Sequence, residues 1–281
     1  MAQTKHQIQE ILAAAQSRPR HRFGQNFMID QNLVRIVAEA GQLKPGELVI
    51  EVGPGTGTLT EELLSSGAHV LAVEIDRDLA AVLRQRLGDA PQFRLIEGDA
   101  LAGKHALNSE LVAAIAQWRQ ADGAAVKLVA NLPYNIASPL VVELLIAGVE
   151  LLAFTVQKEV ADRLNAAPGS DAYGPLTVMV QLLAKVQVLR TLPAQAFWPA
   201  PKIQSALVRL VRDDRLGPSA GAFGGFVHRL FASRRKTLRK ALATAGCDAE
   251  AMLAATGLDG QLRPEVLTPT DVWRLFQQHA T

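Results

Sequence analysis

Cysteine is almost absent from this 281-residue sequence, in which Cys247 is the single example. A single thiol cannot form a disulfide within the chain, which disfavours the disulfide-rich secreted class and favours a reducing compartment. Aromatic residues make up only 5% of the sequence, so the core must be built mainly from Leu, Val, Ile and Ala. No apolar run reaches the roughly 18 residues that a membrane-spanning helix needs, and the histidines lack metal-binding spacing. We therefore expect a cytoplasmic protein with no membrane segment and no metal site.

Neither sign of charge is in large excess, because 29 Lys and Arg residues face 27 Asp and Glu residues and leave a net charge of +2. This balance alone does not identify a nucleic-acid-binding protein. The cations are clustered, however, in residues 1–26 and again between Arg212 and Lys240. Local clusters of this kind suit a polyphosphate partner, although a solvated helix face is an equal alternative on charge alone. The N-terminal cluster consists of Lys5, Arg18, Arg20 and Arg22, opposed only by Glu10.

Short apolar segments alternate with helical patterns over the first two thirds of the chain. Apolar strands that alternate with helices predict a parallel sheet covered on both faces, with right-handed connections. Hydrophobic residues make up 49% of the sequence, which is enough for a large buried core. The expected strands are 48–52, 69–74, 93–96, 126–130 and 152–157, with helices between them that include one beginning near Thr58 and one in the irregular stretch 102–123.

The pattern changes after Tyr173. A helix is expected over 176–185, followed by strands at 186–189 and 206–211 that pair at the edge of the sheet. Residues 216–225 are rich in Gly, Pro, Ser and Ala, which is typical of a linker, and helices are expected from Phe226 onward. We therefore expect a basic N-terminal segment (1–26), a ligand-binding α/β domain (27–215) and a small helical domain (216–281).

A glycine-rich segment, Glu51–Thr58, joins the first strand to its helix. Glycines let the backbone approach a ligand, and a helix N-terminus offers free N–H groups to an anion. Glu74 ends the second strand, where it can accept from ribose hydroxyls, and Asp99 follows the third, where it can accept from an adenine amine. Gly53, Glu74 and Asp99 thus predict a nucleoside-cofactor site. A turn that binds nothing is the alternative, and Thr58 departs from the dinucleotide pattern G-x-G-x-x-G/A.

The tetrapeptide Asn131-Leu132-Pro133-Tyr134 directly follows the fourth strand. The Asn131 side-chain oxygen and the Leu132 carbonyl can accept from the two hydrogens of an adenine amine and localise its lone pair on the nitrogen. Pro133 stiffens the turn, and Tyr134 can stack on an unpaired base. Such a corner suits methylation of the amine by an activated electrophile, because placement supplies most of the catalysis. A plain strand-end turn is the simpler interpretation, but the nearby cofactor candidates favour the chemical one.

Together these motifs resemble the ribosomal RNA adenine dimethyltransferase family, in particular its bacterial branch that acts on the small subunit. The resemblance covers nearly the whole chain, and Trp198 is the clearest departure from the usual pattern. It is carried by Arg22–Phe27, Glu51–Thr60, Val73–Asp76, Gly98–Ala100, Asn131–Pro139, Gln157–Val160 with Arg163, Tyr173-Gly174, Phe197, Pro201-Lys202, Ser205-Ala206 and Arg234–Leu238.

The resemblance implies an α/β fold, a Rossmann-like class I methyltransferase sheet with a small C-terminal helical domain that contacts rRNA. It also implies S-adenosyl-L-methionine as the cofactor and two successive methyl transfers to the N6 amine of an adenosine. The implied partner is ribosomal RNA, in the small ribosomal subunit or its precursor, and the implied role is linked to ribosome assembly. We expect a monomer, since no long heptad pattern indicates a coiled-coil dimer.

The family's functional residues can be transferred to matching positions of this sequence. Phe197 is expected to cover the second face of the target base, and the helix around Ser233–Lys240 is expected to face RNA phosphates. The implied cofactor-binding residues are Asn26, Met28, Gly53, Glu74, Asp99 and Asn131. The implied catalytic residues are Asn131, Leu132, Tyr134 and Phe197. The implied RNA-binding residues are Arg234, Arg235, Arg239 and Lys240.

Three other functions share part of this pattern. A large-subunit rRNA adenine methyltransferase of the antibiotic-resistance type would keep the core motifs, but residues 233–242 and 197–205 favour the small-subunit branch. A non-catalytic rRNA-binding assembly factor would keep the fold, but four intact residues argue against it: Asn131, Tyr134, Glu74 and Asp99. A nicotinamide oxidoreductase offers no role for the Asn131–Tyr134 corner.

Overall fold

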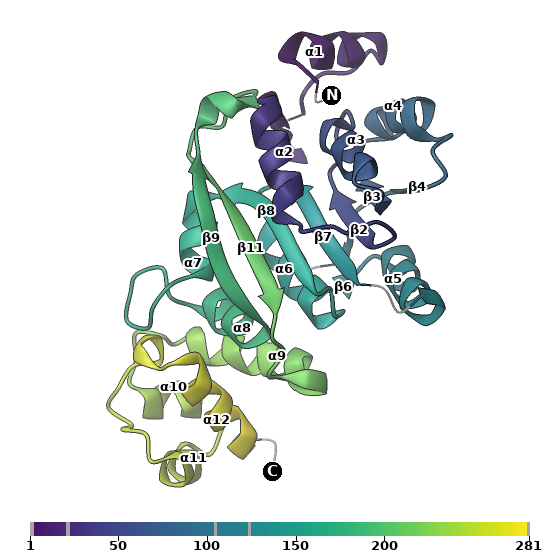
Figure 1. The fold of residues 1–281 in the computed structure, drawn as a ribbon. Helices are drawn as coiled ribbons and strands as arrows, with labels where there is room; N and C mark the ends of the chain where they lie inside the picture. The colour runs from purple at the N-terminus through teal and green to yellow at the C-terminus, as the bar shows by residue number, and fades with distance from the viewer. Residues whose placement is uncertain (1–2, 21–22, 104–105, 123–124, 280–281) are drawn as a thin grey trace. The chain divides into compact units, whose positions relative to one another are not determined.

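The computed structural model describes residues 3–20, 23–103, 106–122 and 125–279, so Arg22 lies outside the described residues. Its central feature is a seven-stranded sheet with the order β4-β3-β2-β7-β8-β11-β9 (Figure 1). The strands from β4 to β8 in this order run parallel, and β11 pairs antiparallel with β8. The expected α/β fold with a parallel sheet is confirmed. The strands are β2 (Leu48–Val52), β3 (His69–Glu74), β4 (Phe93–Glu97), β7 (Val126–Asn131), β8 (Leu151–Gln157), β9 (Ala184–Leu192) and β11 (Ser205–Arg212).

Helices cover the sheet, which explains its continuous apolar strands. All residues of β2 are buried, and β7 and β8 are buried except at their last residues. Helices α2 (Gln31–Ala40) and α3 (Thr58–Ser65) share one hydrophobic cluster with Val49, Val70 and Val129 of the sheet. Figure 1 shows α2 in front of the sheet and α6 (Ala137–Ile146) behind it. Within the described part of the chain, no helix is both long and apolar enough to cross a bilayer.

The expected strand boundaries agree closely with the structure, whereas the regions between the strands differ more. Helix α4 (Arg77–Leu87) follows Asp76 as expected. The irregular stretch contains the helix α5 (Ser109–Asp122), preceded by the short strands β5 (Leu101–Gly103) and β6 (Ala106–Leu107), which the sequence did not indicate. Helix α8 (Pro175–Leu183) ends earlier than expected because Ala184 is already extended and begins the edge strand β9.

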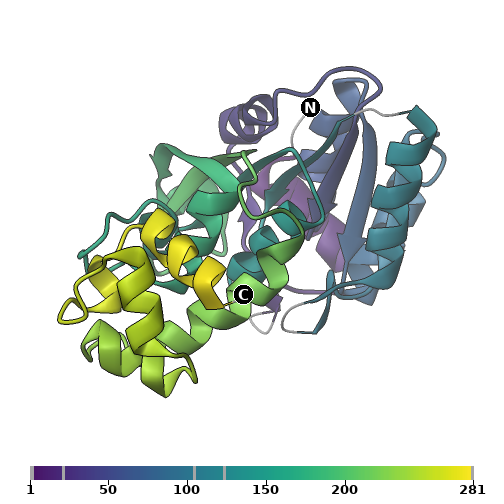
Figure 2. The same cartoon turned by 90° about the horizontal axis from the view of Figure 1, so that it is seen from below.

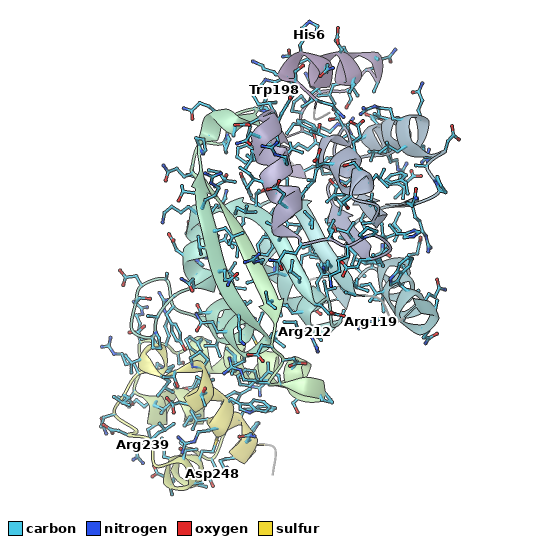
Figure 3. All side chains as sticks on the ribbon, viewed as in Figure 1. His6, Arg119, Trp198, Arg212, Arg239 and Asp248 are labelled. Carbon is cyan, nitrogen blue, oxygen red and sulfur yellow. The ribbon has the colours of Figure 1, made fainter. Side chains whose placement is uncertain are left out.

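The N-terminal segment packs onto the α/β region through apolar contacts. Helix α1 (Lys5–Ala14) begins with a capping box between Thr4 and Gln7. Its buried side chains Ile8 and Leu12 form a cluster with Phe27 and Leu79, against which Trp198 packs beside α1 (Figure 3). Further along, β1 (Phe27–Met28) pairs antiparallel with β10 (Phe197–Trp198).

The chain divides into two compact units. The first comprises Met1–Ala161 and Gln187–Arg212, and the second comprises Asp162–Val186 and Asp213–Thr281. This geometric division differs from the expected functional segments 1–26, 27–215 and 216–281, because α8 packs with α9 (Ala220–Phe231) and α12 (Pro269–His279). Figure 2 shows the helices of the second unit together, including α10 (Leu238–Thr244) and α11 (Ala249–Thr256).

The expected linker at 216–225 is wrong, because α9 begins at Ala220 and includes three of its four glycines. Burial outweighs the low helix propensity of glycine here. Phe223 and Phe226 are fully buried, and Phe223 contacts Trp273 and Phe276 edge-on, with ring centroids 5.2 and 5.4 Å apart. A Cβ at Gly224 would lie 3.5 Å from the Met179 methyl carbon, so the small residue lets α8 and α9 approach closely.

Candidate functional site

The glycine-rich turn after β2 has a backbone that glycine adopts most readily. Gly53, Gly55 and Gly57 have φ angles of 73°, 62° and 88°, in the left-handed region. A Cβ at Gly55 would lie 2.9 Å from a ring carbon of Phe27, and one at Gly53 would lie 3.2 Å from a ring carbon of Pro133. The turn thus lies directly against the segments that carry Asn26 and Asn131, which are far away in the sequence.

Glu74 supports this turn from the neighbouring strand. One of its carboxylate oxygens accepts from the Gly55 N–H at 3.2 Å, and the other accepts from the Asp76 N–H at 2.8 Å. The residue is only 3% exposed. Burial raises the pKa of Glu74 to about 7, although the two backbone hydrogen bonds lower it in part. Glu74 therefore presents a carboxyl group of fixed orientation to the pocket.

A second buried carboxyl group, Glu51, was not among the expected site residues. It is 1% exposed, and burial, together with the nearby Glu74 carboxylate, raises its pKa to about 8. Its Oε2 atom has no hydrogen-bond partner within the described structure. The sequence carried a signal for this residue, since Glu51 is the only charged side chain in the apolar strand Leu48–Val52. Such an unpartnered buried oxygen indicates a ligand that donates hydrogen bonds.

A pocket of about 900 Å³, part of it open to solvent, brings the expected cofactor residues together. Glu51, Glu74 and Asp99 supply carboxyl groups to its wall, and none of the described residues that line it is basic. Asp99 itself is exposed, and its side chain also accepts from the Leu101 N–H. A wall of this kind suits a ligand rich in hydroxyl and amine donors rather than a diphosphate. The lining includes Asn26, Met28, Gly53, Glu74, Asp99 and Asn131.

Asn131 lies at the end of β7 with both ends of its amide group hydrogen-bonded. Its Nδ2 donates to the Asn26 carbonyl at 2.6 Å, and its Oδ1 accepts from the Thr155 hydroxyl. The Asn26 bond fixes which end of the amide is nitrogen, because a carbonyl can only accept. An amide oxygen has two lone pairs, so Oδ1 can accept one more hydrogen bond. The neighbouring Leu132 side chain is buried and the residue is not among those that line the pocket, so the role of its backbone carbonyl stays a prediction.

The two expected aromatic residues are placed differently from each other. Tyr134 is half-buried, and its hydroxyl shares a 2.7 Å hydrogen bond with the Ser205 hydroxyl. Burial raises the pKa of Tyr134, so the phenol is neutral at ordinary pH. Phe197 is only 2% exposed and belongs to the cluster beneath α2. Neither Tyr134 nor Phe197 is among the residues that line the pocket, so the stacking of either ring on a base stays a prediction.

The expected basic helix over 233–240 is interrupted. Residues 232–236 form turns, and α10 begins only at Leu238 after the extended residue Thr237. The cations of this segment disfavour a helix, because a helix would bring like charges three or four positions apart close together, where they repel. The Leu238 and Arg239 N–H groups donate to the carbonyls of Leu262 and Gly260, which anchors the new helix start. Arg234, Arg235, Arg239 and Lys240 are all exposed, and Arg239, labelled in Figure 3, forms an ion pair with Glu250.

Comparison with solved structures places the fold. The crystal structure of the 23S rRNA methyltransferase ErmE matches with a TM-score of 0.64 and 26% identity, covering 91% of this chain and 100% of that one. A dimethyladenosine transferase from Plasmodium falciparum matches with a TM-score of 0.67 and 22% identity, covering 90% and 96% of the two chains. These likenesses confirm the expected class I methyltransferase fold.

Comparison of sequences gives the family. A protein named ribosomal RNA small subunit methyltransferase A from Magnetococcus marinus is 45% identical over 89% of this chain and 88% of its own length. The protein of the same name from Pseudomonas putida is 41% identical over 94% of this chain and 96% of its own length. The family model for ribosomal RNA adenine dimethylase matches residues 16–280. The chain, with its acidic pocket and its Asn-Leu-Pro-Tyr corner, therefore belongs to the ribosomal RNA adenine dimethylase family.

Proposed function

We propose that this protein transfers methyl groups from S-adenosyl-L-methionine to the N6 amine of adenosines in small-subunit ribosomal RNA, twice per nucleotide, as a step linked to ribosome assembly. One observation carries the proposal. Asn131 of the Asn-Leu-Pro-Tyr corner lines the same pocket as Glu74 and Asp99. The acceptor for the amine and the acceptors for a nucleoside cofactor therefore face one space.

The residues present fit S-adenosyl-L-methionine. Its amino group, ribose hydroxyls and adenine amine are donors, and the pocket offers Glu51, Glu74 and Asp99 as acceptors. Glu74 is expected to accept from the ribose hydroxyls and Asp99 from the adenine amine. Asn26, Met28 and Gly53 are expected to contact the cofactor across the same pocket. When bound, the cofactor supplies a methyl group that is already activated by a sulfonium charge.

The chain's own groups position the target amine. The Asn131 Oδ1 and the Leu132 carbonyl are expected to accept its two hydrogens, which localises the lone pair on the nitrogen. The Tyr134 ring is expected to stack on the flipped-out base. No strong base is needed before the transfer, because aligning the nucleophile and excluding water supply most of the rate enhancement. The proton that the amine loses after the transfer can leave to solvent through the open side of the pocket.

The small subunit is the favoured target. The relatives that carry the small-subunit name are 37% to 45% identical to this chain over most of its length, whereas ErmE is 26% identical. Exposed Arg234, Arg235 and Lys240 in the second unit supply positive charge for RNA phosphates. Ribosomal subunits are assembled in the cytoplasm of bacteria, which is where this activity would take place.

The test is radiolabelled methyl transfer to isolated small subunits, large subunits and naked rRNA, all taken from cells that lack the modification. The expected product is N6,N6-dimethyladenosine in small subunits, identified by chromatography after digestion of the RNA. Transfer confined to large subunits would overturn the small-subunit assignment. Tight RNA binding without any transfer by cofactor-loaded protein would support the non-catalytic assembly factor instead.

A further inference from the structure

Two buried hydroxyl groups lie beneath the Asn-Leu-Pro-Tyr corner, on strands that the corner itself does not belong to. Thr155 is on β8 and Ser205 begins β11, and both residues are 0% exposed. Burying a hydroxyl is unfavourable unless it finds a hydrogen-bond partner. Each of these two hydroxyls bonds to a side chain of the corner, Thr155 to Asn131 and Ser205 to Tyr134. The sheet thus carries a pair of polar supports directly under the proposed reaction centre.

The Thr155 bond controls the direction of the Asn131 amide. Thr155 and Asn131 are direct partners in the parallel pairing of β7 and β8, so the bond joins neighbouring side chains of a rigid sheet. The Asn26 carbonyl holds the nitrogen end of the amide and the Thr155 hydroxyl holds the oxygen end. With one lone pair of Oδ1 occupied by Thr155, the remaining lone pair points in a defined direction. Without the hydroxyl, the amide is held at the nitrogen end only.

The Ser205 bond acts on the aromatic side of the corner. Ser205 pairs with Gln157 of β8, and its hydroxyl lies 2.7 Å from the Tyr134 hydroxyl. Burial disfavours ionisation of the phenol, so the bond joins two neutral hydroxyls. It ties the far end of the Tyr134 ring to the sheet and thereby fixes the position of the ring on which a base would stack.

We propose that Thr155 and Ser205 are positioning residues for methyl transfer, and that Thr155 matters most in the second of the two transfers. The inference rests on the proposed function. An unmodified amine has two hydrogens and can engage both acceptors of the corner, which gives it two points of alignment. A monomethylated amine retains one hydrogen and one point of alignment. The direction of each acceptor then decides how well the lone pair faces the incoming methyl group.

The experiment compares Thr155→Val, which replaces the hydroxyl by a methyl group of similar shape, with Thr155→Ser, which keeps the hydroxyl. We expect Thr155→Val to lower kcat about tenfold and to raise the ratio of monomethylated to dimethylated adenosine. Cofactor affinity, measured by calorimetry, should stay unchanged, and Thr155→Ser should restore most of the rate and the product ratio. Thr155→Ala serves as the second hydroxyl-free variant if Thr155→Val does not fold.

Ser205 is tested through its partner. Ser205→Ala and Tyr134→Phe each remove one side of the same bond, so both should lower kcat by a similar factor, about threefold. The double variant should then lose no more than either single variant, because the two share one interaction. Additive losses would show that Ser205 does not act through Tyr134.

Thr256→Val is the matched control. Thr256 is also a buried threonine, but its hydroxyl bonds only within its own helix, to the Met252 carbonyl, and its loss should leave kcat and the product ratio unchanged. Wild-type kcat and product ratio in Thr155→Val would overturn the inference, as would equal losses in Thr155→Val and Thr155→Ser. A wild-type protein that makes no methylated adenosine would refute the proposed function instead.

Discussion

Under the proposed function, the Asn-Leu-Pro-Tyr corner and the basic turn of residues 232–236 would both contact RNA, yet they are built in opposite ways. The polar groups of the corner are hydrogen-bonded to other parts of the fold. Asn131 bonds to Asn26 and to Thr155, and Tyr134 bonds to Ser205. The basic turn holds its charges at the surface on flexible side chains. Aligning a nitrogen with a methyl donor requires placement to within about 0.5 Å, whereas attraction of phosphates acts over a Debye length and tolerates motion. The proposed function would therefore place the chemistry on the sheet and the attraction of phosphates on a turn.

Removing the Asn131 side chain should have the largest effect on the rate of methyl transfer. We expect Asn131→Ala to lower kcat by about 100- to 1000-fold, as when a preorganised polar group is lost from other active sites. RNA affinity should change little, because the attraction to phosphates resides elsewhere. Single-turnover methyl transfer and filter binding would measure the two effects separately. If kcat fell less than about tenfold, positioning by Asn131 could not be the main source of catalysis.

Glu74→Ala is expected to have the next largest effect, on cofactor binding rather than on RNA. The variant removes the expected acceptor for both ribose hydroxyls and also frees the Gly55 and Asp76 N–H groups. We expect the Kd for S-adenosyl-L-methionine, measured by calorimetry, to rise about 100-fold. RNA affinity should be largely intact. A cofactor Kd close to that of the wild type would remove Glu74 from the binding site and contradict the proposed orientation of the cofactor.

Substitutions of the exposed cations should have the opposite effect to Asn131→Ala: they should weaken RNA binding and leave kcat unchanged. Replacing Arg234 and Arg235 of the turn together with Lys240 of the following helix α10 by Ala should weaken RNA binding about 10- to 100-fold near 0.1 M salt and make binding less dependent on salt. At saturating RNA, kcat should stay near the wild-type value. Arg239→Ala alone should cost less than any of these three substitutions, because Arg239 already pairs with Glu250. An unchanged salt dependence in the triple variant would show that RNA binds through other cations.

Much of the first unit could be predicted from the sequence because its signals are local. A strand followed by glycines and a helix is readable within ten or so residues, and the carboxyl ends of parallel strands then bring Gly53, Glu74 and Asp99 to one edge. The hydroxyl supports could not be predicted in this way. Thr155 is 24 residues from Asn131 in the sequence, and Ser205 is 71 residues from Tyr134. Only the register of the paired strands brings them together.

The second unit was harder to predict for a physical reason. Its helix α9 contains glycines that indicate a linker by propensity, and only the burial of Phe223 and Phe226 stabilises the helix. The basic segment was expected to continue as a helix, but repulsion between its cations and the extended Thr237 interrupt it. The burial that stabilises α9 depends on tertiary contacts, which a single sequence does not display, whereas the repulsion in the basic segment is local.

The buried carboxyl group of Glu51 should make the stability of the protein depend on pH. Its folded pKa of about 8 lies above the ordinary value of 4.5, so the folded protein retains a proton that the unfolded chain has lost. Stability should therefore fall as the pH rises through this interval, and Glu74, with a pKa of about 7, should add to the fall. Glu51→Gln removes one of the two titrating groups, so its urea midpoint should depend less on pH between about 5 and 9. Parallel curves for variant and wild type would argue against a proton held at Glu51.

Substitution of Arg20 is expected to have the smallest effect on cofactor binding, and it tests what the N-terminal segment does. Its guanidinium pairs with Asp78 and, at 2.8 Å, with the fully buried Asp76 carboxylate, which also accepts from Gln25 at 3.0 Å. Because the Gln25 bond remains when Arg20 is replaced, Arg20→Gln should raise the cofactor Kd only about two- to fivefold, and less at high salt. Arg35→Gln, which breaks an exposed pair with Glu39, is the control and should have no effect on cofactor binding. If the cofactor Kd were the same for both variants at low salt, Gln25 alone would hold the segment that carries Asn26. The positive charge of Arg20 would then contribute to RNA binding rather than to the pocket.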